Sequence, residues 1–307
     1  MISSRPDRNA SRVSIIASLL IFAFENLQGE TELAISHAKT ALNFMRKQLA
    51  ASVSYSSEKQ VINSVPGLED EVVDSLARWD YMFITTEYMA GDRLLEAEFD
   101  DTEMLTPQEF HNIHEVRGYL RTWQHRSVPY LPALRAALMG LQDSEPPPLG
   151  PPGHYERLTQ SVEDWFNALA PLFARVSEDL TSREFMVFAI QKVSGLLNYL
   201  ALKRAYLGPG ADIAPQCLEL TELALKVVHS PYYRRSFSFD IGLIEAMMVV
   251  CILCPNREIC EDALTVLKLA KGRVEMMSSA EVVAARCEMV LQMRFPAAME
   301  ERVEMIM

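Results

Sequence analysis

Three cysteines in the C-terminal half come closest to a metal-binding pattern, at Cys251, Cys254 and Cys260. Zinc requires four ligands in a tetrahedron, and structural sites take them from thiolates and imidazoles. No second pair of cysteines or histidines lies nearby in the sequence, and Cys251 and Cys260 fall inside apolar helical patterns. Because cysteine is also a common small residue of protein cores, we interpret these thiols as core residues and predict no metal site.

Two histidines, His111 and His114, are three residues apart and are flanked by Glu109 and Glu115. On a helix such residues share a face, which is the geometry of a two-histidine metal edge. A third ligand at a recognised spacing is missing, so an exposed helix is the favoured interpretation. Acidic pairs are abundant in a chain of net charge −12 and single out no acid or base. We therefore assign no catalytic, cofactor-binding or metal-ligating residue.

The common enzyme signatures are absent from the sequence. It contains neither phosphate-binding glycine loop, no G-x-S-x-G nucleophile elbow and no H-E-x-x-H zinc motif. These absences exclude the commonest catalytic designs without excluding enzymes in general. The question of an enzyme stays open, with a non-enzymatic function favoured and no cofactor expected.

Methionines crowd the C-terminal third of the chain. A soft hydrophobic core is the favoured interpretation. The alternative is a groove for a partner helix or an apolar small molecule, since methionine is common at adaptable binding surfaces. The residues are Met247, Met248, Met276, Met277, Met289, Met293, Met299, Met305 and Met307.

Composition describes an ordinary globular chain of 307 residues, with 49% hydrophobic and 23% charged residues. The net charge of −12 argues against direct DNA binding, which needs basic groups against the phosphates. Arg234 and Arg235 beside two tyrosines form a small basic patch, which we interpret as a solvated loop. Five cysteines without regular spacing favour reduced thiols in the nucleus or cytosol.

The N-terminal region combines Arg5, Arg8 and Arg12 with an apolar run from Val13 to Phe24. A signal peptide has this order of charge and apolar residues, but no clear cleavage site follows here. The run is also too short to span a bilayer as a helix. A core helix is the favoured interpretation, and no membrane association is expected.

Apolar residues recur at helical spacing along the chain, whereas long alternating strand patterns are missing. The pattern predicts an all-α fold, an irregular array of paired antiparallel helices in one large domain. The clearest predicted helices are 33–49, 68–89, 155–176, 185–206, 213–228 and 241–254. Pro171 is expected to kink or divide its helix. Asn256 is expected to cap the next helix, and Ser278 with Glu281 has capping-box spacing.

A proline- and glycine-rich segment, 143–153, breaks the helical patterns near the middle of the chain. Its composition excludes helix and sheet. It separates an N-terminal half, 12–142, from a C-terminal half, 154–307, of the same predicted domain. A stiff spacer is the favoured interpretation. The alternative is docking into a groove that binds polyproline helices.

Several segments, taken in order, resemble the fungal-specific transcription factor domain, the regulatory region of zinc-cluster proteins. Ser18–Glu25 is similar to its leucine-rich helix ending in glutamate, and Gly29, His37 and 42–49 follow as in the family. Glu69–Tyr81 is similar to its arginine–leucine–aspartate helix, with Trp79 in place of leucine. Ser238–Ile244, followed by Cys254, Arg257, Ala263 and Leu267, resembles its C-terminal helical hairpin. The resemblance runs from about Arg12 to Phe295.

The resemblance implies a helical regulatory protein of a fungal nucleus, with the cytoplasm as the alternative location. The family reads DNA through a six-cysteine zinc cluster, which this sequence does not contain. A partner protein is therefore expected, either a zinc-cluster factor or a second copy, together with an apolar small-molecule effector. Many relatives govern gene clusters of secondary metabolism. The alternative is a helical small-molecule binder or pathway enzyme built on the same fold.

Overall fold

The computed structural model describes residues 8–53, 72, 105–130, 150–233, 237–238, 242–275 and 277–296. The α-helices are α1 (Arg8–Gln28), α2 (Thr31–Val53), α4 (Ile113–Ser127), α6 (His154–Val176), α7 (Arg183–Leu207), α8 (Ala214–Val228), α9 (Leu243–Leu253), α10 (Arg257–Leu269) and α11 (Ala280–Arg294). Single 3-10 turns, η1 and η2, occupy Val128–Tyr130 and Gly208–Gly210. Three two-residue strands, β1 (Phe237–Ser238), β2 (Val274–Glu275) and β3 (Ser278–Ser279), complete the described elements. The predicted all-α fold is confirmed.

The chain forms two compact units. One comprises residues 1–97 with 237–240, and the other comprises 98–236 with 241–307. Among the described elements, α1, α2 and β1 belong to the first unit and the others to the second. The predicted halves, 12–142 and 154–307 around the segment 143–153, stay a prediction.

Helices α1 and α2 pack against each other as a hairpin that turns at Gly29, whose φ of 85° suits glycine. The buried face of α2 includes three small residues, Ala34, Ala38 and Ala41, as well as Ile35 and Leu42. The opposite face of α1 is also apolar but exposed: Leu20 is 63% exposed, with Val13, Phe24 and Leu27 similarly open. The predicted core helix over 13–24 is therefore buried on one face only.

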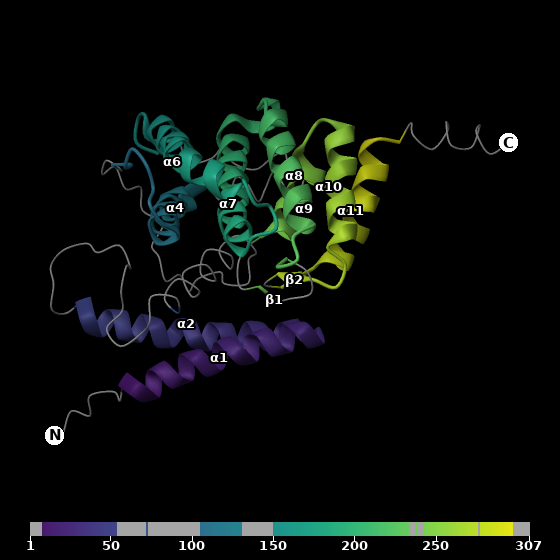
Figure 1. Ribbon diagram of the computed structural model, residues 1–307. Coiled ribbons are helices and arrows are strands. Elements are labelled where there is room, and N and C mark those ends of the chain that lie inside the picture. The colour runs from purple at the N-terminus through teal and green to yellow at the C-terminus, as the bar shows by residue number, and fades with distance from the viewer. Residues whose placement is uncertain are drawn as a thin grey trace, which may run out of the picture. The chain divides into compact units, whose positions relative to one another are not determined.

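The second unit is a row of helices, with α4 and α6 at one end and α10 and α11 at the other (Figure 1). Neighbours along the chain pack together: α6 on α7, α7 on α8, α9 on α10, and α10 on α11. Short turns at 177–182 and 254–256 connect two of these pairs, so their helices run in opposite directions. Strands β2 and β3 form an antiparallel turn in which Val274 pairs with Ser279 and Glu275 with Ser278.

Helix α7 is apolar around most of its circumference and lies inside this row, in contact with α4, α6, α8 and α9. Among the described helices, Arg183–Gly210 has the length and hydropathy of a membrane span, and 67% of its most apolar window is buried. A helix that is hydrophobic all round requires cover on every side. Here neighbouring helices cover most of its surface.

The closest contact in this core is between α6 and α7. The Trp165 indole, 1% exposed, lies directly over Gly195, where an added Cβ would come within 2.6 Å of Cζ3. The Trp165 Nε1–H donates to the Val116 carbonyl of α4 at 3.2 Å, and this bond fixes the ring. A second tryptophan, Trp123, joins the same helices by donating to the Leu158 carbonyl at 2.7 Å. Gly195 therefore provides the space in which the indole sits.

Helix ends agree with the sequence patterns in some places and differ in others. Asn256 caps α10 by accepting the Ile259 N–H at 3.3 Å, as predicted. Pro171 lies inside a continuous α6, so its predicted division of that helix is wrong. The predicted capping box is also wrong, because Ser278 lies in β3 and donates to Glu245. Glu281 instead accepts the Gly272 N–H at 2.9 Å.

Some sequence predictions fall largely or wholly outside the described residues. They concern the helix over 68–89, of which only Val72 is described, the basic pair Arg234 and Arg235, and residues 143–149 of the proline-rich segment. The end of that segment, 150–153, is described and forms a turn that leads into α6.

Replacement of Gly195 by alanine is expected to destabilise the second unit. The new methyl group meets the fixed Trp165 ring at 2.6 and 2.9 Å, so the indole or α7 must shift. Overpacking of this kind costs about 1–3 kcal/mol of unfolding free energy. Urea unfolding followed by tryptophan fluorescence measures the loss.

Gly118→Ala is the matched control, because Gly118 lies inside α4 with nothing within 4 Å of an added Cβ. It is expected to gain roughly 0.5–1 kcal/mol from helix propensity alone. Equal effects of the two substitutions would contradict the close packing of Trp165 on Gly195.

Candidate functional site

A groove opens on the second unit between α6, α7 and α8. It has a volume of about 190 Å³. Its lining combines aromatic, aliphatic and a few polar side chains: Phe166, Leu169, Ala170, Phe173, Lys192, Leu196, Tyr199, Gln216 and Glu219. Pockets of mainly apolar walls with a few placed polar groups are typical sites for small molecules.

The aromatic walls are positioned by helical spacing. Phe166 and Phe173 lie two turns apart on α6, next to the stripe that carries Trp165 into the core. The Phe166 ring packs edge-on against Trp165 at 5.0 Å and lies 6.3 Å from the Tyr199 ring of α7. The sequence shows this second aromatic stripe on α6, but it does not show that α7 and α8 leave it uncovered.

An ion pair crosses the groove rim. Lys192 Nζ lies 2.8 Å from Glu219 Oε1 and 4.8 Å from the centre of the Phe173 ring. Tyr199 donates its hydroxyl hydrogen to Glu163 at 2.7 Å. Burial, followed by this bond to Glu163, raises the pKa of Tyr199, so its phenol stays neutral at physiological pH. The rim therefore presents a donor and an acceptor of opposite charge beside apolar rings, an arrangement suited to binding.

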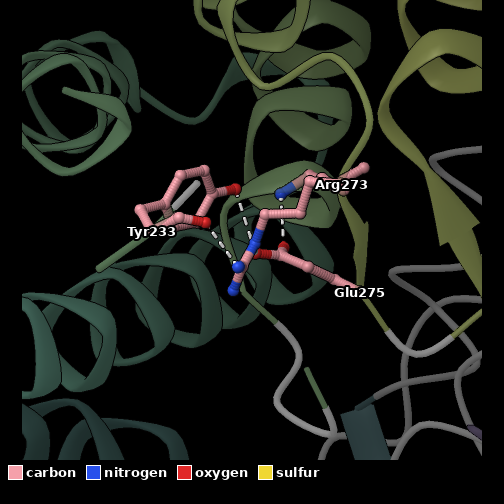
Figure 2. Close-up of polar contacts among 4 residues, drawn as sticks. Tyr233, Arg273 and Glu275 are labelled. Atoms are coloured by element: carbon pink, nitrogen blue, oxygen red, sulfur yellow. Dashed lines mark hydrogen bonds and ion pairs between the residues drawn. The ribbon is translucent and has the colours of Figure 1, made fainter. Parts of the chain in front are cut away.

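A buried polar cluster lies at the start of α9, away from the groove lining (Figure 2). Glu275 accepts hydrogen bonds from Arg273 Nε at 2.9 Å, the Tyr233 hydroxyl at 3.0 Å and the Ile244 N–H at 2.8 Å. Arg273 also donates to the Tyr233 carbonyl at 2.6 Å and stacks on its ring. Both charged side chains are nearly inaccessible, at 6% and 1% exposure.

This cluster joins three parts of the chain that are distant in sequence. Glu275 on β2 occupies the N-terminal end of α9, where free N–H groups and the helix dipole favour a carboxylate. An added Cβ at Gly242 would lie 2.7 Å from Glu275 Oε2, so glycine allows the close approach. With its acceptors occupied in this way, Glu275 holds Tyr233 and the N-terminal end of α9 against β2.

A second buried carboxylate, Glu245, directly follows Ile244, whose N–H Glu275 accepts. Burial raises its pKa, the bond from the Ser278 hydroxyl opposes that rise, and the nearby charges of Glu275 and Arg286 act in opposite directions. Glu245 therefore retains its proton to higher pH than an exposed glutamate.

The cysteines singled out by spacing do come together, along with two others. Cys251, Cys254 and Cys260 meet Cys217 of α8 and Cys287 of α11 in one buried cluster, and all are free thiols. Within the residues that the structure describes, no group of three or more cysteine, histidine or acidic side chains has metal-binding geometry. Sequence spacing could not indicate the approach of Cys217 and Cys287, because helix packing produces it.

The remaining candidates are dispersed. His111 and His114 are exposed at the start of α4, where Asn112 caps the helix and Glu115 accepts the His111 N–H at 2.8 Å. Met247 is buried in the core, whereas Met289 and Met293 are 63% and 72% exposed on α11. None of the methionines that the structure describes lines the groove.

Comparisons with known proteins found no matching family model, no matching curated protein and no matching solved structure.

Glu275→Gln is expected to destabilise the protein by about 3–5 kcal/mol, because it leaves the buried Arg273 charge without its partner. Chemical unfolding measures the loss. The control is Glu261→Gln, which breaks the exposed 2.8 Å pair with Arg257 and should cost at most about 0.5 kcal/mol. Similar small losses in both variants would contradict the anchoring role of the buried pair.

Glu245→Gln is expected to change how stability depends on pH. The native pKa of Glu245 is raised, so its contribution to stability is fully present below its unfolded value of about 4.5 and is lost as pH rises through the native value. Glu245→Gln should therefore gain stability relative to the wild type as the pH rises from 4 to 7. The measurement is the free energy of unfolding of both proteins across this pH range.

The contrasting control is Glu281→Gln. Hydrogen bonds from its own backbone N–H, from Gly272 and from Ser279 lower the pKa of Glu281, so its contribution is lost as pH falls. Glu281→Gln should therefore lose stability relative to the wild type as the pH rises from 4 to 7. A pH-independent difference for Glu245→Gln would refute the burial effect.

Proposed function

We propose that the protein is a helical regulatory module of transcription that acts through a separate DNA-binding protein and responds to a small apolar effector. The observation that carries the effector is the groove between α6, α7 and α8, with three aromatic rings and the Lys192–Glu219 pair at its rim. The net charge of −12 supports dependence on a partner for DNA contact.

The proposed effector is a flat, mostly apolar molecule with few polar groups. Phe166, Phe173 and Tyr199 provide ring faces and edges, against which aromatic molecules pack favourably. Lys192 and Glu219 offer one donor and one acceptor that fix orientation. The ordered sequence resemblance supports a regulator of secondary metabolism that acts in a fungal nucleus.

The small-molecule groove also supports the second candidate, a helical binder or pathway enzyme that handles metabolites directly. In that case the ligand in the groove is cargo or substrate, and transcription does not depend on it. Both candidates require an occupied groove, so the deciding measurement is what changes in the cell when the groove is filled.

Ala170→Trp is the variant that tests both candidates. Ala170 is an exposed residue of α6 in the groove lining, so an indole there fills the groove without entering the core. Ala174→Trp is the matched control, since Ala174 is exposed one turn further along the same helix and outside the lining. In vitro, saturable binding of anilinonaphthalene sulfonate should fall at least about tenfold in Ala170→Trp and remain in Ala174→Trp.

In cells, deletion of the gene should change a coherent set of transcripts. The wild type and Ala174→Trp should restore them, whereas Ala170→Trp should not. Unchanged transcripts together with an altered metabolite would overturn the regulatory proposal and support direct metabolite handling. Restoration by Ala170→Trp would overturn the role of the groove.

A further inference from the structure

The groove between α6, α7 and α8 has a charged end and an aromatic end. Lys192 and Glu219 meet at one end, where the Phe173 ring centre lies 4.8 Å from the Lys192 ammonium. Phe166 and Tyr199 meet at the other end, with ring centres 6.3 Å apart. Lys192 and Tyr199 are two turns apart on α7, about 10 Å along the helix axis. An occupant that spans the groove therefore has a polar group at Lys192 and an apolar ring near Tyr199.

The two charges of the ion pair are held to different degrees. The Lys192 side chain is 23% exposed, and it contacts both the Glu219 carboxylate at 2.8 Å and the face of the Phe173 ring. The Glu219 side chain is 50% exposed and is held by its contact with Lys192. An ion pair with so exposed a partner contributes little to stability. Glu219 is therefore the member of the pair that can move into water at small cost.

This difference determines which ligand charge the groove favours. A ligand anion can replace Glu219 on Lys192 and leave the ammonium on the Phe173 ring, while the released carboxylate is hydrated. A ligand cation that shares Glu219 is repelled by Lys192 at short range. If it instead displaces Lys192, it leaves a largely covered ammonium without its counter-charge. Anions are therefore favoured over cations.

The hydrogen-bonding groups of the lining favour an acceptor on the ligand. An ammonium has three N–H donors, and the contact of Lys192 with Glu219 uses one of them. Gln216 lies one turn before Glu219 on α8 and accepts from Lys203 Nζ through its Oε1 at 3.5 Å, which leaves its NH2 group as a donor. The oxygens of an ionised carboxylate are acceptors only, so they complement these donors.

The volume and the ring geometry limit the apolar part of the ligand. A cavity of about 150 Å³ holds benzene, and the groove has a volume of about 190 Å³. The Phe166 and Tyr199 rings are inclined to each other by 60°, so a third ring can stack on one of them and meet the edge of the other. One aromatic ring with a short acidic side chain fits these limits.

On the basis of the effector role proposed for the groove, we propose that it binds a monocyclic aromatic carboxylate of the cinnamate type. The ligand carboxylate replaces Glu219 on Lys192, and the ligand ring lies against Phe166 and Tyr199. Glu219 thus acts as an internal competitor that pairs with the ammonium while the groove is empty. A neutral molecule of the same shape has the ring contacts but not the ion pair.

Three probes of one shape test the charge preference: anionic cinnamate, neutral cinnamamide and cationic cinnamylamine. Titration calorimetry with the folded full-length protein at pH 7 measures the dissociation constant of each probe. Cinnamate should bind at least about threefold more tightly than cinnamamide, because its contact with Lys192 is charge-assisted, and cinnamylamine should bind most weakly. Equal affinities for cinnamate and cinnamamide, a preference for cinnamylamine, or no saturable binding of cinnamate would overturn the proposal.

Two variants assign the contacts of the carboxylate. Lys192→Met keeps an unbranched side chain beside Phe173 and removes the charge, so the affinity for cinnamate should fall to that for cinnamamide. Glu219→Gln removes the competing carboxylate, so cinnamate should bind about twofold to fivefold more tightly, whereas cinnamamide should be unaffected. Weaker binding of cinnamate to Glu219→Gln would refute the exchange of carboxylates.

Lys226→Met and Glu222→Gln are the matched controls. Both residues are exposed on α8 outside the groove lining, and the two substitutions change the net charge by the same amounts as those in the groove. Both controls should keep the wild-type ratio of the two affinities, for cinnamate and for cinnamamide. A loss of this ratio in Lys226→Met would show that the preference comes from overall charge. Circular dichroism establishes that each variant is folded.

Failure of the carboxylate assignment can be distinguished from failure of the effector groove. If anilinonaphthalene sulfonate and cinnamamide bind, and Ala170→Trp abolishes both, the groove is a binding site; the absence of a preference for cinnamate then rejects only the carboxylate. If Ala170→Trp leaves the binding of every probe unchanged, the groove is rejected together with the carboxylate.

Discussion

Helix α7 is apolar on nearly every side, and the second unit is organised around the need to cover it. Burial of apolar surface is the dominant favourable term in folding, and leaving this surface in water would forfeit its share of that term. Helices α4, α6, α8 and α9 provide the cover, and α6 comes closest because Gly195 lets the Trp165 ring lie against the backbone. The cover is incomplete along the strip that carries Lys192 and Tyr199. The groove opens on that strip, so the candidate site is a consequence of how α7 is packed.

Beyond α8 the chain is held in a different way. A buried set of polar contacts fixes Tyr233, which follows α8, and the N-terminal end of α9 against β2. Arg273 and Glu275 must both give up water, which is costly, and their hydrogen bonds to Tyr233 and Ile244 offset that cost. Such contacts require specific geometry. They therefore define one arrangement of Tyr233, β2 and the start of α9, where apolar contacts would permit several.

The helices themselves could be predicted from sequence, because an apolar stripe at helical spacing is a local property. The predicted ranges 185–206 and 213–228 lie within two residues of α7 and α8. The capping box at Ser278 was wrong, because a nearby buried carboxylate, Glu245, binds that hydroxyl in tertiary structure. The groove and the thiol cluster could not be derived, since each depends on residues from three or more helices. The spacing of Cys251, Cys254 and Cys260 was visible, whereas the positions of Cys217 and Cys287 beside them depend on helix packing.

Helix α8 contributes to both of these places at once. Gln216 and Glu219 line the groove, while Cys217, which lies between them in sequence, points into the sulfur cluster. A helix moves largely as a rigid body, so a shift on one side displaces the other by a similar amount. Mutational tolerance along α8 should follow from this double use. A partly exposed position such as Gln216 is therefore constrained by the packing of the buried side of α8, and a substitution there acts on the groove and on the core together.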